Sequence, residues 1–305
     1  MFFRDRRACA GRATVVATAS LVILGSSLCG AQQLPSKEQD DGPAQRISRF
    51  RPLPGEPAAA SQHPLQTVIA YARREQHYLR QTVSDFTCRL IKRERIGGFL
   101  QDFHYVDMQV REEILADGRV VQPLSIYLRF LGPKMVAGRK VLYVDGQNEG
   151  EMLVRNGGRH FEYVVARIDP NGENAREESL VPVTQIGFTR LLGKMIDVLE
   201  RHQIADPTGQ NSKAERIAGA KINQRSCTLI RVTHPREMEG LEFHVANVFV
   251  DDQLHVPIRV DYSDWPKDAR GPVPLIAEYT YTQLKINVNL PDATFSSGRL
   301  RSGRD

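Results

Sequence analysis

Two stretches of the chain carry apolar residues at the three- and four-residue spacing of an amphipathic helix. The first stripe, in residues 64–83, consists of Leu65, Val68, Ile69, Ala72, Leu79 and Val83. Charged residues such as Arg73 and Arg80 fall on the opposite side. The second stripe, in residues 184–202, consists of Ile186, Leu191, Leu192, Met195, Ile196 and Leu199. The spacing predicts two helices, each with one face to bury.

From residue 85 onward, apolar and polar residues alternate with a period of two, which is typical of strands with one buried face. The first three strands place these side chains on a common face: Phe86, Cys88, Leu90, Val106, Met108, Val110, Leu124, Ile126, Leu128 and Phe130. Further strands are expected near residues 141–144, 152–154, 161–168, 216–221, 227–233, 242–250, 256–262 and 275–289. The whole pattern predicts about ten strands joined in sequence.

The stretch VLYVDGQNEGEMLVRNGG, residues 141–158, holds four glycines and invites comparison with phosphate-binding loops. Neither G-x-x-x-x-G-K-[ST] nor G-x-G-x-x-G occurs in the chain. The glycines instead separate short apolar runs, as they do in the tight turns of antiparallel hairpins. The stretch therefore predicts a β-meander and no nucleotide site.

Strands in sequential hairpins with only two helices indicate an α+β domain. We expect a strongly curved antiparallel sheet, an unclosed half β-barrel, covered by the two helices. The domain is predicted to span residues 63–296.

The ends of the chain lie outside this pattern. Residues 1–31 combine a basic start, a short apolar core and small residues before Ala31, which predicts a secretory signal peptide cut after Ala31. Residues 32–62 are rich in proline and polar residues and are predicted to be a disordered linker. Residues 297–305 are predicted to be a disordered basic tail. A signal of this kind predicts export to the periplasm or cell envelope.

The charge balance argues against a nucleic-acid partner. The chain has a formal net charge of +5, and the four arginines and one aspartate of residues 1–31 contribute +3 of it, leaving +2. No basic stripe with interleaved aromatic residues is present. Arg89, Lys92, Arg93 and Arg95 form a local basic group, interpreted either as a solvated sheet edge or as a contact for anionic lipid head groups.

Two cysteines, Cys88 and Cys227, remain after the predicted cleavage. Both lie in strand-like runs. An exported protein can form a disulfide between them, or the two can be buried free thiols. The spacing of the residues leaves both alternatives open.

The last third of the chain resembles the closing strands of LolA-like lipoprotein carriers. In that superfamily a strand ends in an acidic turn, an apolar-Pro-Ile/Leu-Arg strand follows, and the final strand runs into N-x-x-L-x-D-x-x-F. The matching residues are Asp251, Asp252, Pro257, Ile258, Arg259, Asn287, Leu290, Asp292 and Phe295. Residues 64–295 also resemble, more closely, an uncharacterised exported bacterial family, the domain of unknown function 1571. The carrier resemblance implies a half-barrel with an apolar cavity for acyl chains.

Catalytic and metal-binding motifs are not found. The eight histidines form no H-E-x-x-H and no zinc spacing with cysteine, and no G-x-S-x-G or S-x-x-K is present. Asp251, Asp252 and His255 share one hairpin, where two aspartates are ordinary turn chemistry. We therefore predict a non-enzymatic protein without a cofactor.

The function predicted from these observations is binding of lipid, or of a lipidated partner, in an apolar half-barrel cavity. Residues expected to line that cavity are Phe86, Leu90, Met108, Val110, Leu128, Phe130, Leu192 and Met195. The protein's own side chains can fill the same space, and the alternative function is then an envelope interaction or sensor module acting through its outer sheet edge and loops. A peripheral membrane contact is compatible with both, and the sequence fixes no oligomeric state.

Overall fold

The structure is a computed structural model that describes residues 51–52, 63–157, 164–268 and 271–301. All of these residues belong to the unit Gln45–Asp305. The predicted signal peptide, most of the predicted linker and the first residues of the strand expected at 161–168 lie outside the described residues.

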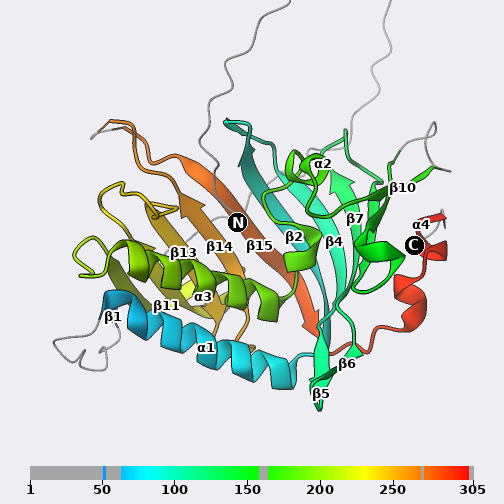
Figure 1. Cartoon of the computed structure of the whole chain (residues 1–305), viewed down its shortest axis with the longest axis horizontal. Helices are drawn as coiled ribbons and strands as arrows, with labels where there is room; N and C mark the ends of the chain where they lie inside the picture. Colours follow the sequence, from blue (N-terminus) through cyan, green and yellow to red (C-terminus); the bar gives the residue numbers. More distant parts are fainter. Residues whose placement is uncertain (1–50, 53–62, 158–163, 269–270, 302–305) are drawn as a thin grey trace, which may run out of the picture. The chain divides into compact units, whose positions relative to one another are not determined.

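One large antiparallel sheet forms most of the described part of the chain (Figure 1). It has 13 strands in the order β1-β11-β12-β13-β14-β15-β2-β4-β7-β8-β9-β10, with β3 paired to β2. The strands of its first half in this order are β1 (Arg51–Pro52), β11 (Lys213–Ile222), β12 (Arg225–Thr233), β13 (Val245–Asp251), β14 (Pro257–Ser263) and β15 (Leu275–Ile286). The others are β2 (Asp85–Ile96), β3 (Phe99–Leu100), β4 (His104–Arg111), β7 (Ser125–Gly132), β8 (Lys140–Val144), β9 (Met152–Arg155) and β10 (Val165–Ile168). Because the order ends at β1 and at β10, the sheet is open, and the predicted α+β class with an unclosed antiparallel sheet is confirmed.

The described residues contain more strands than the sequence pattern predicts. The additional ones are short: β1, β3 and the separate hairpin of β5 (Ile114–Ala116) and β6 (Arg119–Gln122). Strands of two to four residues are too short for a period-two alternation to be recognised.

Helices α1 (Pro64–Thr82) and α3 (Phe188–Ala205) lie side by side on one face of the sheet, and the strands fan and curve behind them (Figure 1). Helix α1 has the predicted bounds to within one residue. Helix α3 begins later than expected, because Val183–Gln185 form a 3₁₀ turn and Gly187 has a φ of 121° that a helix cannot contain. Shorter helical turns are α2 (Glu173–Arg176), α4 (Gly298–Arg301) and the 3₁₀ turns Asn148–Gly150 and Asp292–Phe295.

Two hydrophobic clusters fill the space between the helices and the sheet. The first lies beneath the start of α3 and includes inward side chains of β2, β4 and β7. The second lies between α1, α3 and strands β12 to β14. Met195 of α3 packs against both clusters, so the inward side of the sheet carries one continuous apolar core.

The structure differs from the prediction at both ends of the domain. Residues 298–301 of the predicted disordered tail form α4, and Leu300 is fully buried against outward side chains of β7 and β8 such as Tyr127 and Leu142. Those strands are apolar on both faces, so the tail covers the outer one. At the other end, Arg51 and Pro52 of the predicted linker pair with Ile217 and Ala218 of β11.

Candidate functional site

The structure brings all eight residues predicted to line an apolar cavity into the first hydrophobic cluster. Six of them are buried there: Phe86, Leu90, Met108, Val110, Leu128 and Leu192. Phe130 and Met195 are partly buried and pack against the same cluster. The location of the six strand residues follows the period-two alternation of β2, β4 and β7, and Leu192 and Met195 come from the apolar stripe of α3. The role of all eight in binding a ligand stays a prediction.

Pairing between strands arranges these inward side chains in rows across the sheet. Phe86 lies opposite Val110, and Cys88 lies opposite Met108. The next row joins Leu90 to Val106, and the register continues from Met108 to Leu128 and from Val106 to Phe130. The rows form a continuous apolar surface, called here the apolar floor.

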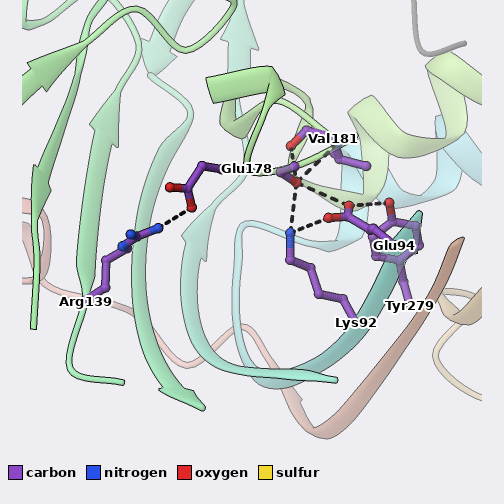
Figure 2. Close-up of polar contacts among 7 residues, drawn as sticks. Lys92, Glu94, Arg139, Glu178, Val181 and Tyr279 are labelled. Carbon is purple, nitrogen blue, oxygen red and sulfur yellow. Dashed lines mark hydrogen bonds and ion pairs between the residues drawn. The ribbon is translucent and has the colours of Figure 1, made fainter. Parts of the chain in front are cut away.

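The row that follows the apolar floor is polar. Lys92 on β2 lies opposite Tyr279 of β15 on one side and His104 of β4 on the other. Glu94 follows on the same inward face of β2, and the exposed fractions of Lys92 and Glu94 are only 8% and 3%. Lys92 Nζ donates to Glu94 Oε2 at 2.8 Å, and the Tyr279 hydroxyl donates to Glu94 Oε1 at 2.6 Å (Figure 2). We call these residues, with His104, the polar end of the floor.

A segment between α2 and α3 covers the polar end. Ser179 Oγ lies 2.9 Å from Lys92 Nζ and 3.2 Å from Glu94 Oε1, so it contacts both members of the ion pair (Figure 2). Beside it, Glu178 forms an ion pair with Arg139, whose side chain lies on the neighbouring part of the sheet. Two polar contacts thus fasten this segment to the sheet.

The environment of the polar end changes the acidity of two of its groups. Burial raises the pKa of the Tyr279 hydroxyl well above its usual range, and the nearby Tyr262 and Glu94 act in the same direction. Tyr279 is therefore a neutral hydrogen-bond donor. Burial also lowers the pKa of His104, as does the positive charge of Lys92, so the His104 imidazole is held neutral.

Side chains of the protein cover the apolar floor. Phe188 at the start of α3 stacks on Phe86 with 4.4 Å between ring centroids, and Leu192 and Val183 are buried in the same cluster. A cavity of about 20 Å³ lies between α1, α3 and the sheet, lined by Ala72, Met195 and their neighbours. A space of this size holds about one water molecule. An acyl chain can reach the floor only where the covering side chains move away.

Lys92 corrects the interpretation of a basic sheet edge. Strand β2 lies between β15 and β4 in the middle of the sheet, and Lys92 points inward while Arg89 and Arg93 alternate with it on the outer face. The signal was available in the sequence, since Lys92 and Glu94 continue the parity of Phe86, Cys88 and Leu90. Ser179 lies 87 residues from Lys92 along the chain and has no comparable sequence signal.

The other candidate polar residues serve the structure of turns. The carboxylate of Asp251 accepts hydrogen bonds from the backbone N–H groups of Gln253 and Leu254 and from Arg225. Asp252 accepts from Ser226, and His255 lies 3.1 Å from Glu75 of α1. Among the described residues, no group of three or more His, Cys, Asp or Glu side chains is placed to hold a metal ion.

Cys88 and Cys227 are both buried free cysteines, which corresponds to the second of the two alternatives left by the sequence. Burial raises the pKa of the Cys227 thiol to about 11 and raises that of Cys88 further. Both thiols are therefore neutral parts of the apolar core.

None of the helices in the described ranges combines the length and the apolar character needed to cross a bilayer. This finding concerns residues 63–157, 164–268 and 271–301, where these helices lie.

Solved structures with similar folds come from several bacteria. A DUF1329 family protein from Desulfovibrio piger is 14% identical, with a TM-score of 0.36 over 78% of this chain and 100% of its own. An outer membrane lipoprotein-sorting protein domain from Vibrio parahaemolyticus is 10% identical, with a TM-score of 0.37 over 76% and 97%. A LolA superfamily protein from Nitrosomonas europaea is 8% identical, with a TM-score of 0.32 over 76% and 98%. The fold described above follows from the strand order of this chain itself.

The search of curated proteins finds no match to this chain. A family model described as "Protein of unknown function (DUF1571)" matches residues 83–299, which include the apolar floor, the polar end and the covering segment. The chain therefore belongs to the DUF1571 family.

Proposed function

We propose that this is a non-enzymatic exported protein of the cell envelope that binds the acyl chain of a lipid, or of a lipidated partner, on the inward face of its sheet. The observation that carries the proposal is the order of inward side chains along β2. Phe86, Cys88 and Leu90 are apolar, and Lys92 and Glu94 follow them on the same face. An amphiphile has the same order, with an apolar chain that ends in a polar group.

The dimensions of the floor agree with this proposal. At about 3.3 Å per residue, the six steps from Phe86 to Lys92 span about 20 Å. That length is comparable with an extended long-chain acyl group. Each buried CH₂ contributes about 0.8 kcal/mol, so sixteen carbons could provide about 13 kcal/mol before the costs of ordering and of displacing side chains.

Binding requires that the protein's own cover leaves the floor. Phe188 and Leu192 from α3, and Val183 from the segment before it, occupy the surface that the chain would cover. The ligand would take the place of these side chains, so the apolar area that it buries is partly offset by the apolar area that they expose. Weakening the cover should therefore increase affinity for an acyl chain.

A variant that removes part of the cover tests the proposal. Phe188→Ala leaves an apolar space above Phe86, at a cost of about 3–5 kcal/mol in the free energy of unfolding, and apolar spaces of this kind stay dry and accept apolar ligands. We expect Phe188→Ala to bind methyl palmitate at least tenfold more tightly than the unmodified protein, measured by native mass spectrometry.

The matched control is Phe243→Ala. Phe243 is buried in the second cluster, away from the floor, so its removal should leave the affinity unchanged. Thermal melting shows whether each variant is folded at the temperature of the measurement. If Phe188→Ala takes up no methyl palmitate, or if both variants gain equally, the floor is not the chain-binding surface.

Export is tested separately from binding. When the full chain is produced in a bacterium with an active export pathway, the N-terminal sequence of the envelope fraction should begin at Gln32. A product that retains residues 1–31 would contradict cleavage after Ala31.

A second candidate function, an interaction or sensor module, is supported by the β5–β6 hairpin. Leu115 and Val120 lie opposite each other in this hairpin with exposed fractions of 59% and 54%. Isolated two-stranded hairpins are only marginally stable, so an exposed apolar pair here suits contact with another molecule. A photoreactive residue at position 120, compared with one at Gln101, should give a discrete cross-linked product in the envelope; equal cross-linking at both positions would argue against this role.

A further inference from the structure

The ion pair of the polar end is deeply buried, although the fold does not require it. Burying a lysine and a glutamate is costly, and replacing such a pair with apolar side chains of similar volume is often neutral or stabilising. Lys92 and Glu94 lie two residues apart on one strand and do not set the register of the sheet, which the backbone pairing of β2 with β15 and β4 provides. Their chemistry is therefore better explained by what they contact than by stability.

The main polar contact of this pair outside the sheet is a single hydroxyl group. Ser179 Oγ accepts a hydrogen bond from Lys92 Nζ at 2.9 Å. Its proton can be donated to Glu94 Oε1 at 3.2 Å or to its own segment at the carbonyl of Val181 at 3.1 Å. An alcohol oxygen that accepts from the ammonium and donates to the carboxylate thus satisfies both charges at once (Figure 2).

The charges of the pair discriminate between kinds of head group. A carboxylate or phosphate could accept from Lys92, but it would face Glu94, which needs a donor in that place. An ammonium group could donate to Glu94, but it would face Lys92. Tyr279 cannot relieve either conflict, because its hydroxyl already donates to Glu94. A neutral group with both a lone pair and an O–H meets neither repulsion.

We propose that the polar end recognises the hydroxyl head group of a neutral lipid, such as an acylglycerol or a glycolipid, and that Ser179 occupies the place of the ligand hydroxyl when no lipid is bound. This inference rests on the proposed function, since the acyl chain must lie along the apolar floor for its head group to reach Lys92 and Glu94. It adds the chemical class of the ligand, which chain binding alone does not specify.

The covering segment has the features that such an exchange requires. Its charged contact to the sheet, Glu178 with Arg139, lies near the surface, where the exposed fractions of the two side chains are 55% and 19%. The apolar residues after Ser179, Leu180 and Val181, are only partly buried. Lifting the segment would uncover the polar end and leave Lys92 and Glu94 paired, each without the hydrogen bond that it now makes with Ser179.

Three probes with the same sixteen-carbon chain and different heads test the inference on the full exported protein: 1-monopalmitoylglycerol, palmitate and methyl palmitate. We expect monopalmitoylglycerol to bind about tenfold more tightly than methyl palmitate, a difference of about 1.4 kcal/mol, and palmitate to bind no better than methyl palmitate. Equal affinity for all three would overturn the head-group inference and leave chain binding intact. Tightest binding of palmitate would also overturn it, and failure of all three to bind would overturn the proposed function itself.

A double variant assigns the preference to the ion pair. Lys92→Met with Glu94→Leu replaces both charges with apolar side chains, so no charge is left unpaired. It should abolish the tenfold preference for monopalmitoylglycerol over methyl palmitate. The matched control is Arg89→Met with Asp107→Leu, an ion pair at 2.8 Å on the opposite face of β2 and β4. A preference that survives in the first double variant, or disappears in the control, would overturn the assignment.

Ser179→Ala provides an independent measurement. If Ser179 competes with the ligand hydroxyl, its removal should raise the affinity for monopalmitoylglycerol about threefold, which is more than it raises the affinity for methyl palmitate. A decrease in affinity for monopalmitoylglycerol would show instead that Ser179 is part of the site, and would contradict the exchange.

Discussion

The two ends of α3 are both fixed by buried ionisable side chains, but their chemistry is opposite. At the first end, the carboxylate of Glu112, with an exposed fraction of 1%, accepts hydrogen bonds from the backbone N–H of Phe188 and from the hydroxyl of Thr189. At the other end, two fully buried imidazoles, His202 and His234, lie 2.9 Å apart between Nδ1 and Nε2. One end thus uses a buried carboxyl group as the hydrogen-bond acceptor, and the other uses a pair of neutral rings.

The hydrogen bonds of the histidine pair require both rings to be neutral. His202 Nε2 accepts from the backbone N–H of Glu242 at 3.2 Å, so the proton of His202 is on Nδ1 and points to His234 Nε2. His234 then carries its proton on Nδ1, which lies 3.1 Å from the carbonyl of Asn211 and 3.3 Å from Ser212 Oγ. Adding a proton to either ring destroys one of these bonds, because each Nε2 already serves as an acceptor.

Because of burial, the stability contributed by the two ends changes with pH in opposite directions. Burial raises the pKa of Glu112, so its contribution to stability is fully present below the unfolded value of about 4.5 and falls as pH rises through the raised folded pKa. Burial, together with the nearby His234 and Arg201, lowers the pKa of His202 to about 3. Its contribution is present above the unfolded value of about 6.5 and is lost as pH falls toward about 3. The end that covers the apolar floor and the end that packs on the second cluster should therefore respond to different conditions.

The largest effect is expected from a variant that removes the hydrogen bonds at the Glu112 end of α3. Glu112→Ala leaves the Phe188 N–H and the Thr189 hydroxyl without acceptors in a buried site, which should cost about 3 kcal/mol. Glu112→Gln keeps an acceptor oxygen and should cost about 1 kcal/mol, and it should abolish the decline of stability at higher pH. Urea unfolding measures both. Glu113→Ala, at the adjacent and partly exposed carboxylate, is the control and should cost less than 1 kcal/mol; a similar loss for both alanine variants would contradict a special role for Glu112.

The next effect is the loss of stability in acid at the histidine end. Below about pH 6.5, a group that stays neutral in the folded state costs about 1.4 kcal/mol per pH unit, so His202 should remove about 2 kcal/mol at pH 5. His202→Gln keeps a donor and an acceptor without titrating. The difference in the free energy of unfolding between pH 7 and pH 5 should therefore be about 2 kcal/mol smaller in this variant than in the unmodified protein.

The groups that face the pair shape this response. Arg201 opposes protonation of His202 and His244 opposes that of His234, whereas Asp206, which accepts from Ser212 at 2.8 Å, favours protonation of His234. His77→Gln, on the exposed side of α1, is the control because its hydrogen bond to Gln81 is exposed. An unchanged pH response in His202→Gln would show that other groups account for the acid sensitivity.

The sequence predicts the elements joined by these contacts better than the contacts themselves. Regular spacing in α1 and alternation in β2 and β4 reveal the helices and the apolar floor, because each pattern lies within a single element. Glu112 lies 76 residues from Phe188 and His202 lies 32 residues from His234, so no local pattern links them. Both would be assigned to the surface from residue type alone.

The polar end is an intermediate case. The alternation that places Leu90 inward also places Lys92 and Glu94 inward, so the period of two by itself predicts their location. Grouping Lys92 with the charged residues beside it in the sequence places it on the outer face instead. What the alternation cannot supply is the partner across the chain, Ser179, which depends on how the segment before α3 returns to the sheet.

Surface ion pairs near the two ends of α3 should also differ in their contribution to the free energy of unfolding, by smaller amounts. Partial burial tends to raise the pKa of Asp145, but its hydrogen bond from Arg190 holds that pKa below the usual value. Arg190 contacts both Asp145 at 2.9 Å and Glu113 at 3.2 Å, whereas Arg201 contacts Glu242 alone among the carboxylates described. We expect Arg190→Ala to cost about 1 kcal/mol and Arg201→Ala about 0.5 kcal/mol in urea unfolding. The reverse order would indicate that the histidine end depends on charge more than its neutral pair implies.

The smallest effect is expected on the exposed side of α3, where Glu200 forms an ion pair with Arg73 of α1. Their exposed fractions are 41% and 59%, so water screens the attraction, and holding two long side chains in place costs entropy. Arg73→Ala, Glu200→Ala and the double variant should each change the free energy of unfolding by less than about 0.5 kcal/mol. The coupling energy from this cycle should fall further in 1 M salt, whereas the effect of Glu112→Gln should persist because its site is buried. A coupling energy above about 1 kcal/mol would mean that α3 is also held to α1 between its two ends. The two ends would then not determine separately how α3 covers the apolar floor.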